Sequence, residues 1–222
     1  MLERRPRGVL IDAGGTLLHT AAPLADVYVR FAAAHGVVGL SPALVKQRFK
    51  AAFSAPLPAG QALRYVGDGR DFWRRVVAHS TGCDDEALFD ALFHHFADPS
   101  AWAVADGAAD ALARLRAAGV KTALVSNFDT RLRPLLHALA LADAFDAVVI
   151  SAEVLVEKPD PRIYSLACSA LGLRPADCLH AGDDEANDVG ASLQAGVGTA
   201  WLWERDVGSF KELADRVLSA AS

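Results

Sequence analysis

Asp12 is the first residue of the chain whose type and position favour chemistry. It follows the short apolar run Gly8–Ile11 and precedes the glycine pair Gly14-Gly15 and Thr16. A carboxylate at the end of a buried strand can attack phosphorus or an alkyl carbon and form a covalent ester. Ligands bind at the carboxyl ends of strands in open parallel sheets, so we expect Gly15 and Thr16 to contact a substrate there. The alternative is an aspartate that only caps a turn.

Two further segments carry groups that suit an anionic substrate. Ser126 and Asn127 follow the apolar run Lys121–Val125, at the end of the second predicted strand. A serine in that position could also cap the next helix. Lys158 is followed by Pro159, which restricts the loop backbone. An ammonium group near several carboxylates offsets their repulsion and helps to bind an anion, whereas the alternative is a solvated loop lysine.

The most specific segment is acidic. Gly182–Asp188 follows the apolar run Leu179–Ala181 and contains Asp183, Asp184 and Asp188. Carboxylate oxygens are hard ligands of the kind that Mg²⁺ prefers. An acidic loop that complements the dipole of a following helix would explain one aspartate, but not the whole arrangement of strand, acidic turn and helix.

In this order, the four segments resemble the four motifs of the haloacid dehalogenase (HAD) superfamily. The resemblance implies three catalytic residues. Asp12 would be the nucleophile, Ser126 would hold phosphoryl oxygens, and Lys158 would neutralise charge around them. Asn127 would lie beside a small phosphorylated substrate.

The same resemblance implies a Mg²⁺ cofactor. Asp12 and Asp183 would be direct carboxylate ligands, and the backbone carbonyl of Gly14 would be the third protein ligand. Asp188 would complete the site by holding a metal-bound water, or it would orient Lys158.

Gly14 is the departure from the family pattern. HAD phosphatases carry a second aspartate at that position, which protonates the leaving oxygen and then activates water. Positioned proton transfer of this kind contributes about 10²–10⁴-fold to a rate. Without it, three possibilities stay open: an activated leaving group such as an acyl or aryl phosphate, a substitute acid for which His19 and His35 are weak candidates, or ligand binding with little turnover. Superfamily dehalogenases also lack this aspartate, but they generally lack the metal-binding pattern of Gly182-Asp183.

The elements that must position these side chains can be predicted from periodicity. Five short apolar runs bounded by turn residues predict buried parallel strands; they are Gly8–Ile11, Lys121–Val125, Ala147–Ile150, Cys178–Ala181 and Thr199–Trp203. Helical stretches lie between them, at Asp106–Ala118, Thr130–Leu139, Pro161–Leu171 and Glu185–Ala195. Alternating strands and helices with short links predict an α/β fold with a doubly wound parallel sheet, the Rossmann-like core that the HAD resemblance also implies.

Residues 21–102 interrupt this alternation. They contain no convincing strand and read as four amphipathic helices, Pro23–His35, Ser41–Phe53, Arg70–Ser80 and Asp84–Phe96. We interpret them as a helical cap in the C1 position, inserted into a core formed by residues 1–20 and 103–222. Arg70, in a glycine-punctuated loop, could contact a phosphorylated substrate. The cap stretch Tyr65–Arg70, the pair Phe72-Trp73 and the glycine at position 14 are similar to the subgroup called haloacid dehalogenase-like hydrolase domain-containing protein 3, or rhythmically expressed gene product-like.

Composition narrows the partners. The net charge is −5 and no long basic block occurs, so nucleic acid is not expected; the cluster Arg4, Arg5 and Arg7 is interpreted as a solvated tail. No apolar run approaches the ~20 residues that span a bilayer, so no membrane partner is expected. Three cysteines without a CxxC spacing favour a reducing compartment, the cytoplasm or an organelle interior, rather than secretion. The sequence leaves the oligomeric state open between a monomer and a weak dimer.

The sequence therefore predicts a Mg²⁺-dependent, phosphatase-type hydrolase that acts through an aspartyl-phosphate at Asp12. Because Gly14 supplies no acid, we expect it to be slow or restricted to activated leaving groups. The alternative is a catalytically silent protein of the same fold that binds a phosphorylated ligand or a protein partner, and a metal-independent dehalogenase is a weaker third hypothesis.

Overall fold

A parallel sheet forms the centre of the larger part of the molecule. In the computed structural model, which describes residues 2 and 4–221, five strands of this sheet are found in the order β5-β4-β1-β6-β7. Their bounds are β1 Gly8–Ile11, β4 Lys121–Ser126, β5 Ala147–Ile150, β6 Cys178–Gly182 and β7 Thr199–Leu202. Each pair is parallel. The predicted α/β class and doubly wound sheet are confirmed, and the predicted strands match within one residue at each end.

The strand order reverses around β1. From β1 the chain leads to β4 and β5 on one side of the sheet, and to β6 and β7 on the other. Leu10 pairs with Ala123 of β4 and with His180 of β6, so the three strands end at nearly the same level. A reversal of this kind is where ligands bind in open α/β sheets. It brings the residues that follow β1, β4 and β6 together.

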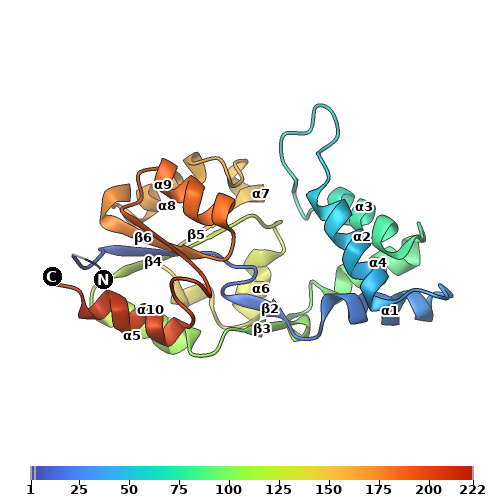
Figure 1. Cartoon of the computed structure of the whole chain (residues 1–222), viewed down its shortest axis with the longest axis horizontal. Helices are drawn as coiled ribbons and strands as arrows, with labels where there is room; N and C mark the ends of the chain where they lie inside the picture. Colours follow the sequence, from blue (N-terminus) through green and yellow to red (C-terminus); the bar gives the residue numbers. More distant parts are fainter. Residues whose placement is uncertain (1, 3, 222) are drawn as a thin grey trace. The chain divides into compact units, whose positions relative to one another are not determined.

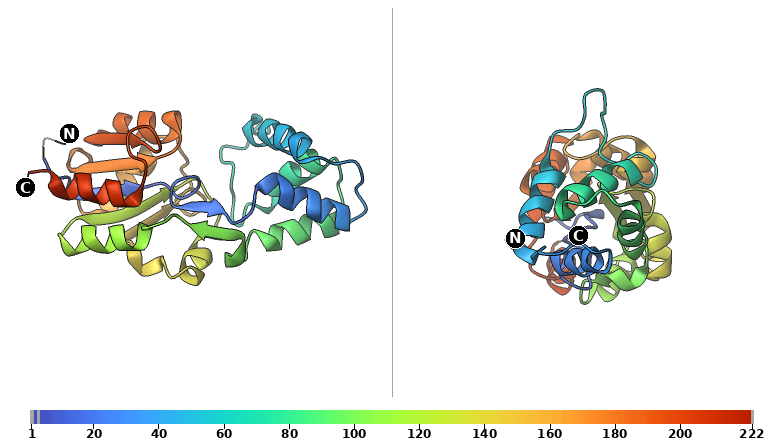
Figure 2. Two further views of the ribbon diagram at one scale, coloured as in Figure 1. Left: turned by 60° about the horizontal axis from the view of Figure 1, so that its bottom comes forward. Right: turned by 90° about the vertical axis from the view of Figure 1, so that its right-hand side faces the viewer.

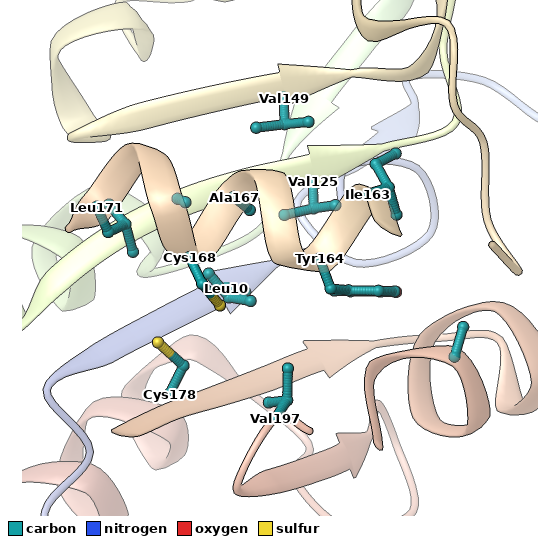
Figure 3. Packing of buried hydrophobic residues seen from close by; sticks show 12 residues of the cluster. Leu10, Val125, Val149, Ile163, Tyr164, Ala167, Cys168, Leu171, Cys178 and Val197 are labelled. Atoms are coloured by element: carbon teal, nitrogen blue, oxygen red, sulfur yellow. The ribbon is translucent and has the colours of Figure 1, made fainter. Parts of the chain in front are cut away.

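Helices cover both faces of the sheet (Figure 1). Helices α8 (Arg162–Leu171) and α9 (Ala191–Gln194) lie on one face, and α5 (Ala108–Ala117) and α10 (Phe210–Ser219) lie side by side on the other, as Figure 2 also shows. The buried cluster between α8 and the sheet is mostly aliphatic, with Leu10, Val125 and Val149 from the strands facing Ile163 and Ala167 of the helix (Figure 3). Burial of this apolar surface is the main stabilising contribution.

Several elements of the core differ from the expectation. The predicted helix Glu185–Ala195 begins as a π-helix, η4 (Glu185–Gly190), which the Asp184 side chain caps by accepting hydrogen bonds from the N–H groups of Ala186 and Asn187. Helix α10 was not predicted, although Ser209 and Glu212 form a recognisable helix-start pattern. Other short elements are α6 (Leu132–Ala138), α7 (Ser151–Val154), η2 (Ala142–Ala144) and η3 (Pro175–Asp177).

The amino-terminal arginines are exposed in part, as a solvated tail would be, but two of them also bind the core. Arg4 and Arg7 are exposed, while the Arg4 guanidinium pairs with Asp177 at 2.8 Å. Arg5 is half-buried, and its guanidinium donates to the Leu218 carbonyl at 2.6 Å. The backbone N–H of Arg5 also donates to the Ala221 carbonyl, so Arg5 lies against the residues that follow α10. The charge cluster alone did not predict these acceptors, which the folded core presents.

The second part of the molecule is helical. Its described residues include four helices, α1 Leu24–Ala34, α2 Pro42–Ser54, α3 Arg70–Thr81 and α4 Glu86–His95, as the amphipathic pattern indicated. The Ser41 hydroxyl caps α2 by accepting from the Leu44 N–H, and Pro42 occupies the first helical position. The short helix η1 (Pro99–Ala101) follows α4. The core of this helical part is a cluster of aromatic and aliphatic side chains.

Two compact units result, one of residues up to His19 and from Val104 onward, the other of Thr20–Ala103. The chain passes between them through a two-stranded sheet that was not predicted, β2 (Leu18–Thr20) with β3 (Trp102–Val104). We refer to the units as the core and the cap. In the described part of the chain, no helix is both long and apolar enough to cross a membrane.

Candidate active site

Asp12 lies at the carboxyl end of the central strand. Its backbone N–H continues the sheet by donating to the Ala181 carbonyl, at 3.0 Å, and its side chain is almost fully buried. The chain then turns sharply, because the N–H groups of Leu17 and Leu18 both donate to the Ala13 carbonyl. This tight turn aims Asp12 at the neighbouring strand ends.

Gly15 is required by that turn. It has a φ of 83°, a conformation that glycine adopts without strain. A Cβ placed on it would lie 2.2 Å from Oδ2 of Asp183. The second glycine of motif one therefore allows the carboxylate that follows β6 to approach the turn that follows β1. Gly182 has a similar role, since a Cβ there would lie 2.3 Å from the Asp188 carboxyl carbon.

Gly14 has the opposite character. A Cβ built on it meets no heavy atom within 4 Å, and its φ is not in the left-handed region. The backbone would therefore accept an aspartate at this position. In the described chain, the hydrogen bonds of the turn use the Ala13 and Leu18 carbonyls and leave the Gly14 carbonyl unengaged. The structure thus has room for the family's second acid and keeps the carbonyl that was predicted to bind metal.

Lys158 joins the carboxylates. Its Nζ donates to Oδ1 of Asp12 and to Oδ1 of Asp188, both at 2.6 Å, and all three side chains are buried. Charge-assisted hydrogen bonds of this length are strong, and a buried charge needs such partners. The lysine therefore fixes the relative positions of two carboxylates that lie 176 residues apart in the sequence.

Asn127 holds this lysine in place. Its side-chain Nδ2 donates to the Lys158 carbonyl at 2.9 Å, and its Oδ1 accepts from the Lys158 N–H at 2.7 Å. The substrate contact predicted for Asn127 remains a prediction, while the observed contacts give it a positioning role. Ser126 is the buried last residue of β4, and Thr16 is buried with a hydroxyl that has no hydrogen-bond partner among the described residues.

Asp188 accepts more hydrogen bonds than the sequence predicted. Besides Lys158, its Oδ1 accepts from the Tyr164 hydroxyl at 3.2 Å and lies 3.1 Å from Nε2 of His180, while its Oδ2 accepts from the Asp184 N–H at 2.9 Å. A carboxylate offers about four lone-pair sites. These contacts agree with the second of the two predicted roles of Asp188, the orientation of Lys158, and the first role, the holding of a metal-bound water, remains a prediction.

Tyr164 and His180 were missed by the sequence reasoning. His180 had a signal, because it is a polar residue inside the otherwise apolar run of β6. Tyr164 had little, because an aromatic residue on a helix that packs against a sheet is normally part of the core.

Burial and charge shift the ionisation of the site. Burial raises the pKa of Asp12 to about 7; the Lys158 ammonium opposes this rise, and the carboxylates of Asp188 and Asp183 add to it. Burial works against ionised Asp188, but Lys158 and His180 outweigh it and hold the pKa of Asp188 below its usual value. The pKa of Lys158 is raised, because Asp12 and Asp188 outweigh the desolvation of its ammonium group. Burial lowers the pKa of His180, so its imidazole is neutral.

The arrangement fits a hard cation. Carboxylate oxygens of Asp12, Asp183 and Asp188 lie within 4.8 Å of one another. Asp183 is an exposed residue. Partial desolvation of its carboxyl group and the nearby charge of Asp188 raise the pKa of Asp183, as expected where carboxylates gather at one place. Hydrogen-bond donors already occupy the oxygens of Asp188, and the predicted binding of Mg²⁺ by Asp12, Asp183 and the Gly14 carbonyl remains a prediction.

Arg70 belongs to the cap. Its guanidinium pairs with Asp90 and stacks on the rings of Phe89 and Phe93, at 5.0 and 4.9 Å from their centroids. These contacts are internal to the cap, and the substrate contact expected of Arg70 remains a prediction.

A buried carboxylate at the switch point of a parallel sheet, with a lysine and an acidic turn beside it, is typical of a class of α/β hydrolases. The family model for haloacid dehalogenase-like hydrolase matches residues 6–196. The mouse "Haloacid dehalogenase-like hydrolase domain-containing protein 3" is 34% identical over 200 residues, which cover 84% of this chain and 77% of that protein. The chain therefore belongs to the haloacid dehalogenase-like hydrolases, and its resemblance to the subgroup around the mouse protein is confirmed.

Two further comparisons extend this result. A phosphoglycolate phosphatase from Pectobacterium atrosepticum is 29% identical over 199 residues, covering 86% of this chain and 77% of that enzyme. The crystal structure of a HAD phosphatase from Thermococcus onnurineus superposes with a TM-score of 0.63 at 23% identity, covering 96% of this chain and 98% of that one. The latter likeness shows that the fold is shared.

Proposed function

We propose that this protein is a Mg²⁺-dependent hydrolase of small phosphorylated molecules that prefers activated leaving groups such as acyl and aryl phosphates. One observation carries the proposal: the buried Asp12–Lys158 pair lies beside the acidic turn at Asp183, while position 14 offers space but no acid. The similarity to a phosphoglycolate phosphatase supports the phosphatase type.

The chemistry would run in two displacements at phosphorus. In the first, a carboxylate oxygen of Asp12 bonds to phosphorus, and the leaving oxygen departs with its electron pair. In the second, water attacks the phosphorus of the aspartyl-phosphate, loses a proton to solvent, and releases inorganic phosphate and free Asp12. Lys158 would hold positive charge beside the phosphoryl oxygens throughout. Bound Mg²⁺, held by Asp12, Asp183 and the Gly14 carbonyl, would supply further positive charge there.

The leaving group decides the substrate class in this proposal. An alkoxide leaves poorly unless an acid protonates it, and that acid is worth about 10²–10⁴-fold. A carboxylate or a phenolate leaves without one. Gly14 therefore restricts the reaction to phosphates whose leaving groups are stable anions.

The first experiment is steady-state hydrolysis of acetyl phosphate, p-nitrophenyl phosphate and an alkyl phosphate, each with and without Mg²⁺. We expect the wild type to favour the first two and to need Mg²⁺. Asp12→Asn should lower turnover at least about a thousandfold, because the nucleophile is lost. Asp215→Asn is the matched control: it removes an exposed carboxylate of α10 and should leave turnover unchanged. Equal activity of Asp12→Asn and wild type would overturn the proposal.

The open space at Gly14 also favours a second candidate, a protein that binds a phosphorylated ligand without turnover. Gly14→Asp separates the two functions. If the wild type is inactive on every phosphate and only Gly14→Asp turns over, the pocket is a phosphatase site that lacks its acid. Release of chloride from a 2-haloacid without Mg²⁺ would instead support the dehalogenase hypothesis.

A further inference from the structure

We infer that Tyr164 and His180 are positioning residues, which hold the Asp188 carboxylate in the one orientation that anchors Lys158 beside Asp12. The inference rests on the proposed function for the role of Lys158 in turnover, but the hydrogen-bond arrangement can be tested without any turnover.

Both carboxylate oxygens of Asp188 have hydrogen-bond partners. Its Oδ1 meets the Lys158 ammonium at 2.6 Å, the Tyr164 hydroxyl at 3.2 Å and Nε2 of His180 at 3.1 Å. Its Oδ2 accepts from the Asp184 N–H at 2.9 Å. Rotation of the carboxylate would break all of these contacts together. The orientation of Asp188 is therefore set by the protein rather than by the lysine alone.

Tyr164 and His180 come from two elements that pack against each other, helix α8 and strand β6. On β6, Cys178, His180 and Gly182 share the face that packs against α8, because side chains alternate along a strand. On α8, Tyr164 and Cys168 are one turn apart and share a stripe. Cys178 and Cys168 meet at one level of this interface, and Tyr164 lies one helical turn further toward the strand ends (Figure 3). The Tyr164 and His180 rings meet edge to face at 4.9 Å.

Apolar packing alone does not account for this pair. A phenylalanine and a leucine would fill the same space between α8 and β6 without bringing polar atoms into a buried layer, where each costs free energy unless it is hydrogen-bonded. The Tyr164 hydroxyl has one hydrogen, which it shares between the Asn187 carbonyl at 2.7 Å and Oδ1 of Asp188 at 3.2 Å, and Nε2 of His180 lies 3.1 Å from the same oxygen of Asp188. The Tyr164 hydroxyl and Nε2 of His180 thus point at the turn that carries Asp188, while Nδ1 of His180 is buried with no hydrogen-bond partner among the described residues.

Asp188 transmits this orientation to Lys158. The Lys158 ammonium donates to Asp12 and Asp188 and lies 5.9 Å from the centroid of the Tyr164 ring. Of the two carboxylates, Asp188 is also held by side chains from α8 and β6. If Asp188 rotates, the ammonium group keeps Asp12 as its remaining hydrogen-bond acceptor and moves toward it. Such a shift would take positive charge away from the phosphoryl oxygens that Lys158 is proposed to hold.

The test combines amide hydrogen exchange, followed by NMR on the whole protein, with acetyl phosphate hydrolysis. The Asp184 N–H reports on Asp188, since its hydrogen bond ends on Oδ2. The Thr122 N–H is the matched control, because it donates to the Asp146 carboxylate elsewhere in the core. We expect Tyr164→Phe to speed exchange at Asp184 and to lower kcat, each by about three- to tenfold, with no change at Thr122.

Conservative rescue distinguishes positioning from packing. His180→Gln retains an N–H near Nε2 and should preserve slow exchange at Asp184, whereas His180→Leu, of similar size, should not. Tyr28→Phe removes a buried hydroxyl from the cap and should change neither readout. Unchanged Asp184 exchange in both Tyr164→Phe and His180→Leu would overturn the inference, and Tyr164→Phe alone decides it if His180→Leu does not fold. If the wild type hydrolyses no phosphate but Asp184 exchange responds as expected, the proposed function fails while the positioning role stands.

Discussion

The core and the cap are stabilised by different kinds of interaction. Among the residues that the structure describes, every buried Asp, Lys and His belongs to the core, and the network around Lys158 is the densest example. The cap instead has an aromatic cluster, in which Phe72, Phe89 and Phe93 are buried and Phe49, Phe53 and Trp73 are partly buried. Its ion pairs, such as that of Arg70 with Asp90, lie near the surface.

This difference predicts which amino-acid substitutions the protein tolerates. Apolar burial has no preferred direction and depends mainly on area, so the cap can accept many side chains of similar volume. Buried charges depend on geometry, and removing one partner exposes the full cost of desolvating the other. The stability of the core therefore depends on Asp12, Lys158 and Asp188 being present together.

The largest expected effect comes from removing the cation of that set. Lys158→Met leaves two buried carboxylates without a counter-charge, and we expect a loss of about 3–5 kcal/mol in the free energy of unfolding at pH 8. Burial already raises the pKa of Asp12 to about 7, and without Lys158 it should rise further, while the pKa of Asp188 should rise from its lowered value. A carboxyl group whose pKa is raised by folding contributes stability at low pH, and this contribution is lost as the pH rises through the folded pKa. The loss should therefore be smaller at pH 5 than at pH 8, as urea unfolding at both pH values would show.

Arg70→Met provides the matched control from the cap. It removes an ion pair whose side chains are 35% and 38% exposed, and surface pairs of this kind contribute at most about 1 kcal/mol. Its effect should depend little on pH between 5 and 8. An Arg70→Met loss as large as that of Lys158→Met would remove the contrast between the two units.

Truncation of the aromatic cluster should destabilise the cap by a similar or somewhat smaller amount. Phe89 is 2% exposed and packs against Phe93 and the guanidinium groups of Arg70 and Arg74. Phe89→Ala should cost about 3–5 kcal/mol through lost burial and the cavity that remains. Phe89→Leu, which keeps most of the volume, should cost less. Mg²⁺ affinity, measured by calorimetry under native conditions, should stay at the wild-type value in both variants, and a marked decrease would show that the cap shapes the core site.

The smallest predicted effect contrasts two adjacent glycines. Gly15→Ala places a Cβ 2.2 Å from Asp183 at a φ of 83°, so Asp183 must move, and Mg²⁺ affinity should fall about tenfold. Gly14→Ala meets no atom within 4 Å and should bind Mg²⁺ like the wild type. Titration calorimetry on the two variants measures this difference directly. Equal affinities would show that Asp183 is not a metal ligand, or that it can bind from a displaced position.

Much of the fold could be predicted because its signals are local. The runs before Asp12, Ser126 and Asp183 are short and mostly apolar and end at polar residues, which is the pattern of buried parallel strands. Helix α10 also had a local signal, because its Ser209 cap is present in the sequence. The π-helix at Glu185 had none, since Asp184 indicates only where a helix begins.

The sequence by itself determined which chemical groups are present: a carboxylate, a hydroxyl, a lysine and an acidic turn, each at the end of an element, with glycine where an acid is usual at position 14. Only the tertiary structure decided how they are joined. The Asn127 side chain forms hydrogen bonds with the Lys158 backbone, and Tyr164 and His180 both contact Asp188. Of the two adjacent glycines, Gly15 rather than Gly14 is sterically required. The physical reason is that periodicity and turn residues act over a few neighbours, whereas a hydrogen bond between residues far apart in the chain depends on how strands pair and helices pack.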